Sequence, residues 1–120
     1  MSKILIVDDS ATVREMVSDI LKKNGLQVLE AADGVEAKAQ IQSGSPDLVV
    51  TDIVMPRMNG YELCRWLKND PKAQNIPVVM CTSKSQEFDR YWGMKQGADA
   101  YITKPFRPAE LIQTIKQLLR

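Results

Sequence analysis

The sequence predicts an α/β domain in which helices cover both faces of a five-stranded parallel sheet. Five short apolar runs alternate with stretches whose apolar residues recur at helical spacing, and short connections join them. The runs are uninterrupted, as is typical of strands that are buried on both faces. Alternation of this kind favours parallel strands joined by right-handed crossovers.

The predicted strands are the apolar runs at residues 3–7, 27–31, 47–51, 78–81 and 101–103. Signals for the start or the end of a helix lie between these runs and after the last one. Ser10 is a good N-cap for the first helix, and Gly25 ends it in the C′ position. Asn59 caps the third helix, Gly97 ends the fourth, and Pro108 suits the first turn of the last.

Two helices are less clearly marked. Asp33-Gly34 is typical of a turn, so we expect the second helix only over residues 35–42. The fourth helix covers about residues 87–96 and contains Gly93, which costs about 1 kcal/mol relative to alanine. We therefore expect the fourth helix to be easily displaced.

Length and charge narrow the class of protein. A chain of 120 residues fits one domain, at residues 1–120. A net charge of +1 gives no basic field for bulk nucleic-acid binding. No apolar stretch is long enough to span a membrane and no signal peptide is evident, so we expect a cytoplasmic protein that contacts no membrane.

The histidine and cysteine content excludes several kinds of active site. The chain has no histidine, which excludes Ser-His-Asp and Cys-His catalysis, histidine-ligated metals and a phosphohistidine carrier. Its two cysteines lack the spacing of a metal site. Cys81 lies within an apolar run, so we interpret it as a small buried side chain.

Four of the five apolar runs end at a reactive polar residue. Asp8 and Asp9 follow the first run, Asp52 the third, Thr82 the fourth and Lys104 the fifth. The carboxyl ends of parallel strands share one edge, where open α/β sheets bind ligands, so we expect these side chains to meet in one pocket. The second run supplies no such residue, which fits a strand at the edge of the sheet.

Three carboxylates in one pocket repel one another unless a cation neutralises them or one is protonated. A site made of oxygen ligands with room for water suits Mg²⁺ better than zinc or copper. The charges of Asp8, Asp9 and Asp52 sum to −3, and those of Mg²⁺ and Lys104 sum to +3. A carboxylate needs no base to act as a nucleophile, so Asp52 can attack phosphorus and form an acyl phosphate.

Taken one at a time, these residues have simpler explanations. Asp8-Asp9 can form a helix-capping turn, and Asp52 can be an ordinary loop acid. Thr82 can be an N-cap or a turn residue, and Lys104 a turn lysine. Their occurrence together, each at the end of a strand, favours the shared pocket.

These residues, with the Met-Pro-x-x-Asn-Gly loop at residues 55–60, resemble the receiver domain of two-component response regulators over essentially the whole chain. The resemblance implies a flavodoxin-like (βα)5 fold with strand order 2-1-3-4-5, and phosphotransfer from a histidine kinase to Asp52. It implies Mg²⁺ ligation by Asp9, Asp52 and the backbone carbonyl of Val54, with Asp8 acting partly through water. Such a domain is not an enzyme in the usual sense, because it catalyses only its own phosphotransfer and slow self-dephosphorylation.

The motif Lys104-Pro105-Phe106 belongs to the same resemblance, which also implies a switch. Thr82 moves toward the phosphoryl group, and the ring of Tyr101 turns inward behind it. The bond between Lys104 and Pro105 is expected to be cis, which aims Lys104 into the site.

The resemblance narrows further at residues 91–98. No output domain is evident, so the chain resembles the stand-alone, CheY-like branch, and this segment resembles the PilH-type regulators of twitching motility and phototaxis. The family binds partners at the face formed by the fourth helix, fifth strand and fifth helix. We expect a downstream motility or signalling protein there, contacting Arg90 and Trp92, although Trp92 can also be partly core.

The resemblance also gives a role to Val54, because in the family this position affects how water reaches the acyl phosphate. An apolar Val54 should hinder the positioning of that water and so slow self-dephosphorylation.

Three other functions are compatible with parts of the pattern. A Mg²⁺-dependent phosphatase or phosphotransferase also uses an aspartyl nucleophile, but no cap segment is evident to select a substrate. A nucleotide or flavin binder needs a Gly-rich loop after the first strand, where this chain has Asp8-Asp9-Ser10. A phosphate sink without an output partner has the same sequence features as a switch.

Overall fold

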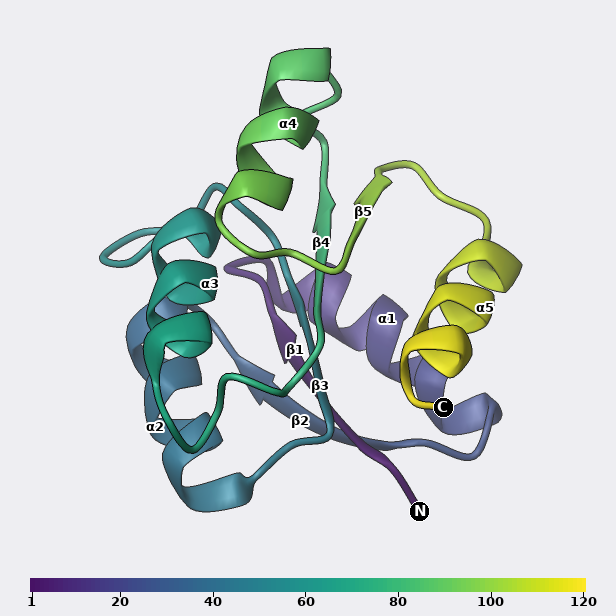
Figure 1. The fold of residues 1–120 in the computed structure, drawn as a ribbon. Helices are drawn as coiled ribbons and strands as arrows, with labels where there is room; N and C mark the ends of the chain where they lie inside the picture. The colour runs from purple at the N-terminus through teal and green to yellow at the C-terminus, as the bar shows by residue number, and fades with distance from the viewer.

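The computed structural model describes residues 1–120 as one sheet of five parallel strands with five helices (Figure 1). The strands are β1 (Lys3–Val7), β2 (Gln27–Ala31), β3 (Leu48–Thr51), β4 (Val78–Thr82) and β5 (Ala100–Thr103). The helices are α1 (Ala11–Lys23), α2 (Gly34–Gly44), α3 (Gly60–Asn69), α4 (Glu87–Lys95) and α5 (Pro108–Leu118). The strand order is β2-β1-β3-β4-β5, which confirms the predicted fold.

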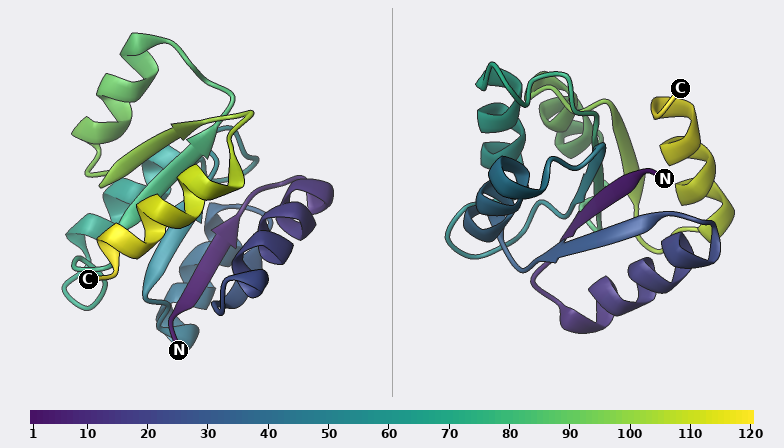
Figure 2. Two further views of the ribbon diagram at one scale, coloured as in Figure 1. Left: turned by 90° about the vertical axis from the view of Figure 1, so that its right-hand side faces the viewer. Right: turned by 90° about the horizontal axis from the view of Figure 1, so that it is seen from below.

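The sheet separates two apolar layers because successive strand residues point to opposite faces. On one face, Ile4 and Ile6 pack with α1 and α5, which lie on the near side of the sheet in the left view of Figure 2. On the other face, Leu5 and Val7 pack with α2 and α3, and Tyr101 joins the same layer. The central strands are therefore buried on both sides, as their uninterrupted apolar runs predict.

The predicted start signals of two helices are confirmed. The Ser10 hydroxyl accepts a hydrogen bond from the backbone N–H of Val13 at 3.2 Å, at the start of α1. Asn59 and Glu62 form a reciprocal capping box at the start of α3. Gly25 follows the end of α1 with a φ of 79°, a conformation that favours glycine.

The predicted start of the second helix is wrong. The helix begins at Gly34 rather than after it, and Asp33 is its N-cap, whose Oδ1 accepts the backbone N–H of Glu36 at 2.9 Å. It also runs on to Gly44, two residues beyond the predicted end at residue 42. An Asp-Gly pair is as compatible with an N-cap as with a turn, because both use the aspartate side chain to accept a backbone N–H.

The register of the strands brings their carboxyl ends to one edge. Val7 pairs with Ala31 on one side and with Thr51 on the other, and Thr82 pairs with Thr103. β2 lies at the edge of the sheet, as its lack of a reactive residue suggests. None of the helices has both the length and the apolar character that a membrane crossing requires.

Candidate functional site

Backbone hydrogen bonds continue the register past the strand ends and place the reactive residues together. The N–H of Asp52 donates to the carbonyl of Val7 at 2.9 Å, so Asp52 lies beside the start of the β1–α1 loop. The N–H of Lys104 donates to the carbonyl of Thr82 at 2.8 Å. The pocket thus follows directly from the strand pairing.

The three predicted carboxylates form a cluster at this edge. Asp8, Asp9 and Asp52 each offer one oxygen, and these oxygens lie within 4.8 Å of one another. Asp8 is buried, Asp52 is half-buried and Asp9 is exposed. Oδ1 of Asp8 accepts the N–H of Ser10 at 2.9 Å, and Oδ1 of Asp52 accepts the N–H of Ile53 at 2.6 Å. Two of the three carboxylates are therefore held by their own backbone turns.

Lys104 binds two of these carboxylates. Its bond to Pro105 is cis, as expected, and its Nζ donates to Oδ2 of Asp8 at 2.7 Å and to Oδ2 of Asp52 at 3.2 Å. Burial by itself would lower the pKa of Lys104, but the hydrogen bond that Lys104 donates to Asp8 and the charges of both carboxylates outweigh it and raise the pKa. Lys104 is therefore a fixed cation in this pocket.

The donor set of the pocket fits Mg²⁺. Three carboxylates and one ammonium leave a formal charge of −2 at a site with only oxygen ligands and no histidine or thiolate. Hard divalent cations prefer such ligands. Asp8, Asp9 and Asp52 would hold the ion from the side chains, and the predicted backbone ligand, Val54, follows Asp52 by two residues.

The predicted switch residues, Thr82 and Tyr101, meet at the backbone of Lys84. The hydroxyl of Thr82, which is fully buried, accepts the N–H of Lys84 at 3.3 Å. The hydroxyl of Tyr101 donates to the carbonyl of Lys84 at 2.7 Å, and its ring is buried. Burial raises the pKa of Tyr101 to about 12, so the hydroxyl stays a hydrogen-bond donor at neutral pH. One residue of the β4–α4 loop, Lys84, therefore connects the two predicted switch residues.

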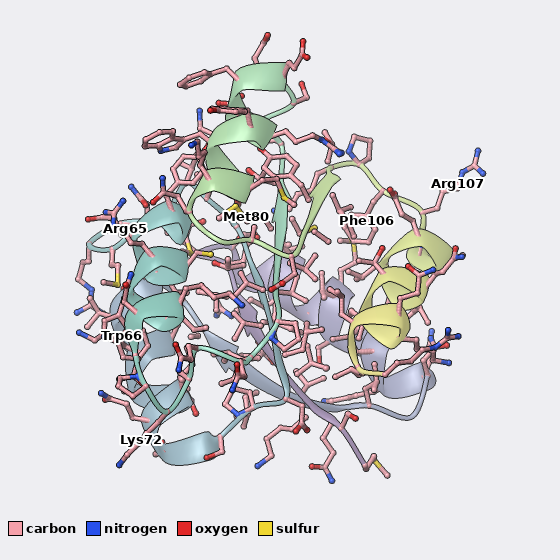
Figure 3. The ribbon with its side chains drawn as sticks, in the orientation of Figure 1. Arg65, Trp66, Lys72, Met80, Phe106 and Arg107 are labelled. Atoms are coloured by element: carbon pink, nitrogen blue, oxygen red, sulfur yellow. The ribbon has the colours of Figure 1, made fainter.

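The residues predicted on the partner face have different environments. Trp92 is exposed, so it is not part of the core. Arg90 is exposed too, but its guanidinium donates to the carbonyl of Tyr101 at 3.2 Å and lies over the Tyr101 ring. Two residues outside that prediction complete the view of this side: Arg107 points away from the protein just before α5, and the buried Met80 lies beneath α4 (Figure 3).

Gly93 has a packing role that the sequence did not reveal. A Cβ at this position would lie 2.8 Å from Sδ of Met80 and 3.2 Å from the ring of Tyr101. The glycine lets α4 approach β4 and β5 closely, so it is more than a weak point of the helix.

Cys81 is buried next to the pocket, as predicted. Burial raises its pKa to about 12, and that of Cys64, also buried, to about 11. Both thiols therefore stay protonated near neutral pH and are poor nucleophiles.

One pair of charged residues beside the pocket was missed. Nε of Arg57 donates to Oδ2 of Asp33 at 2.7 Å, between the β3–α3 loop and the start of α2. Asp33 is buried, and Arg57 has a φ of 65°. The hydrogen bond from Arg57, followed by the backbone N–H of Glu36, lowers the pKa of Asp33. The only sequence signal was the N-cap potential of Asp33, which we interpreted as a turn.

Comparison with known proteins agrees with this geometry. The family model described as the response regulator receiver domain matches residues 4–116. PilH of Pseudomonas aeruginosa is 44% identical over 119 residues, which cover 99% of this chain and 98% of PilH. The phosphate regulon transcriptional regulatory protein PhoB of Escherichia coli is 43% identical over 118 residues, but the chain spans only 52% of its length.

A solved structure shows the same fold. The chemotaxis response regulator CheY4 of Vibrio cholerae superposes with a TM-score of 0.91 at 35% identity, covering 98% of each chain. Receiver domains are signalling domains of two-component systems, in which a histidine kinase phosphorylates an aspartate and Mg²⁺ binds at an acidic pocket. The match over residues 4–116, the near full-length identity with PilH and the shared fold show that this chain belongs to the response regulator receiver domain family.

Proposed function

We propose that the chain is a phosphorylation switch that accepts a phosphoryl group on Asp52 from a histidine kinase. The observation that carries the proposal is the position of Asp52, whose Oδ2 is 3.2 Å from the ammonium of Lys104 within a cluster of three carboxylates. A carboxylate needs no general base to act as a nucleophile. Its side chain is partly exposed, so a donor can approach it.

The chemistry exchanges one bond to phosphorus for another. An oxygen of Asp52 bonds to phosphorus while the bond to the imidazole nitrogen of the donor breaks, and the imidazole leaves with the electron pair. Lys104 stabilises the charge on the phosphoryl oxygens, and Thr82 donates a hydrogen bond to the new group. Asp8, Asp9, Asp52 and the carbonyl of Val54 would hold Mg²⁺. The bound ion would act as a Lewis acid and offset the charge on the phosphoryl oxygens.

The signal leaves through the β4–α4 loop, in which Lys84 is hydrogen-bonded to both Thr82 and Tyr101. When the Thr82 hydroxyl turns to the phosphoryl group, it releases the N–H of Lys84, whose carbonyl holds Tyr101. Arg90 is bound to Tyr101, so the face of α4, β5 and α5 changes with it. The partner proposed for this face is a downstream motility or signalling protein, as in chemotaxis-type or twitching-type pathways. The likeness to CheY4 and PilH supports this pathway class.

The proposal is tested by incubation with acetyl phosphate and Mg²⁺, followed by intact mass measurement. Wild type should gain one phosphoryl group, and Asp52→Asn should gain none. Asp47→Asn is a matched control, because Asp47 lies just before β3 whereas Asp52 lies just after it. The Asp47 variant should be phosphorylated like wild type. Absence of any adduct in wild type, or an adduct that persists in Asp52→Asn, contradicts the proposal.

A further inference from the structure

The edge strand supplies no residue to the pocket, but two acids near its end bind arginines of α1 and of the β3–α3 loop. Glu30 accepts from Nε of Arg14 at 3.1 Å, and Nη1 of Arg14 donates to the carbonyl of Asp8 at 2.7 Å. Asp33 accepts from Nε of Arg57 at 2.7 Å. The two loops that carry the predicted metal ligands are thus both attached to the β2–α2 region.

The contact between Asp33 and Arg57 is the better built of the two. The Asp33 side chain is 7% exposed, whereas that of Glu30 is 43% exposed. Both oxygens of Asp33 are used, Oδ2 by Arg57 and Oδ1 by the N–H of Glu36. A buried carboxylate with both oxygens bound has one stable orientation, and it fixes the guanidinium that it binds.

Backbone contacts hold the same loop at neighbouring positions. The N–H of Gly34 donates to the carbonyl of Met58 at 3.1 Å, and a Cβ on Gly34 would lie 2.6 Å from Cγ of Met58. On the other side, the N–H of Gly60 donates to the carbonyl of Ile53 at 2.9 Å. Arg57 has a φ of 65°, which costs free energy for a residue other than glycine and persists only where the surroundings hold it.

We propose that Asp33 and Arg57 are positioning residues that fix residues 53–59 of the β3–α3 loop, and through them the metal ligand proposed at Val54. Neither residue touches the phosphoryl group or the metal in this assignment. The link to the metal rests on the proposed function. The ordering of the loop does not rest on the proposed function, because the structure itself contains the contacts that hold the loop.

Two single variants separate positioning from simple electrostatics. Asp33→Asn keeps an N-cap but removes the carboxylate that Arg57 binds at 2.7 Å, so Arg57 keeps only its 3.9 Å contact with Glu36. Arg57→Asn keeps a residue that tolerates positive φ but leaves Asp33 as an unpaired negative charge. If charge alone acted on Mg²⁺, the first variant would weaken binding and the second would strengthen it. If the pair instead acts by positioning the loop, both variants weaken Mg²⁺ binding.

The measurement is Mg²⁺ affinity by isothermal titration calorimetry, with urea unfolding of each variant. Both variants should bind Mg²⁺ about tenfold more weakly, in the range of losses caused by removing groups that orient metal ligands. The double variant should lose little more than either single variant, since each breaks the same contact. Asp99→Asn is the matched control, because it removes the charge that pairs with Lys68. Asp99 lies just before β5, at the opposite end of that strand from Lys104, and an asparagine there can still accept the N–H of Val78. This variant should leave Mg²⁺ affinity unchanged.

Amide hydrogen exchange of residues 53–60 without Mg²⁺ provides a second readout. Exchange should be faster in Asp33→Asn and Arg57→Asn than in wild type and unchanged in Asp99→Asn. Opposite shifts of Mg²⁺ affinity in the two single variants, or unchanged exchange in both, overturn the positioning role. If wild type binds no Mg²⁺ and takes up no phosphoryl group, the proposed function fails, and the exchange data alone still decide whether the pair orders the loop.

Discussion

The pocket has two flanks, and different contacts hold them in place. On the β2–α2 flank, a buried carboxylate binds the β3–α3 loop through Arg57, and backbone atoms of Gly34 and Met58 are hydrogen-bonded. At the far end of that loop, a Cβ on Gly60 would overlap the carbonyl oxygen of Asp52. Backbone packs on backbone here, and neither side has a flexible group that can yield.

The α4–β5 flank is held by fewer and softer contacts. Gly93 is the one buried residue of α4, and it faces the side chain of Met80 and the ring of Tyr101. Phe88, Tyr91, Trp92 and Met94 are large apolar residues of this helix that remain exposed. Side chains, rather than backbone, join α4 to the sheet.

The difference indicates which part of the domain can move. An element with few buried apolar contacts opens at a lower free energy than one held by close backbone packing. Movement triggered in the pocket should therefore pass to α4 and β5, while the β2–α2 flank keeps the site in shape. Substitutions of the same kind on the two flanks test this comparison.

The largest effect is expected from Gly60→Ala, because its methyl group would meet backbone atoms that cannot move away. A Cβ here would lie 2.9 Å from Cα of Ile53 and overlap the Asp52 carbonyl oxygen. We expect a loss of about 3 kcal/mol in the free energy of unfolding, measured with urea. Gly25→Ala is the control: its φ is positive but no atom lies within 4 Å, so it should lose only about 1 kcal/mol. Equal losses would contradict the close packing at Gly60.

A smaller effect is expected from Val54→Asn, which changes the first exposed side chain that follows Asp52 in the β3–α3 loop. Val54 is 60% exposed, and an apolar side chain there cannot hold a water molecule near the acyl phosphate. We expect phosphorylated Val54→Asn to lose its phosphoryl group about tenfold faster, a modest gain from orienting the attacking water. Val54→Ala, which removes bulk without adding a polar group, should decay close to the wild-type rate. An unchanged or slower decay in Val54→Asn would rule out this role.

On the α4–β5 flank, Gly93→Ala should change the free energy of unfolding by less than about 1 kcal/mol. Alanine gains about 1 kcal/mol in a helix interior, and this gain offsets the crowding against Met80 and Tyr101. The thioether of Met80 is flexible enough to yield. Urea unfolding gives the stability, and the near-ultraviolet circular dichroism of the chain should change, because α4 shifts outward from the Tyr101 ring. A loss as large as that of Gly60→Ala would show that the two flanks are equally rigid.

The sheet edge was predictable because the signals for it are local. An uninterrupted apolar run marks each central strand, and parallel order then places Asp8, Asp52 and Lys104 at the same edge of the sheet. The strand order that makes them neighbours is what the resemblance to receiver domains implies. The structure confirms that these side chains meet. The function of each remains a proposal that phosphorylation must test.

The β2–α2 flank was not predictable because its contacts are long-range. Asp33 and Arg57 are 24 residues apart, and neither lies at a position that hydrophobic periodicity marks. Gly93 was interpreted as a weak point of its helix because Met80 and Tyr101, which require its small size, lie on other elements. A local pattern shows that a residue is unusual, but its reason often lies across the fold.

The smallest expected effect concerns the β2–α2 flank alone: the free energy of unfolding should depend on pH through the ionisation of Asp33. Its pKa is lowered in the folded chain, first by the hydrogen bond from Arg57 and then by the N–H of Glu36. The stability that the ionised carboxylate contributes is therefore complete above its unfolded pKa of about 3.9 and is lost as the pH falls through the lower folded value. Arg57 is 55% exposed and screened by solvent, so the change is small.

Urea unfolding of wild type and Asp33→Asn between about pH 7 and pH 3 measures this contribution directly. Wild type should be the more stable at neutral pH, and the difference should shrink below about pH 4 as the carboxylate takes up a proton. In Arg57→Asn the decline should be shallower than in wild type, because the Glu36 N–H alone then favours the ionised form. A difference between wild type and Asp33→Asn that stays constant across this range would mean that the charge of Asp33 does not stabilise the flank, and that its packing and N-cap alone hold the loop.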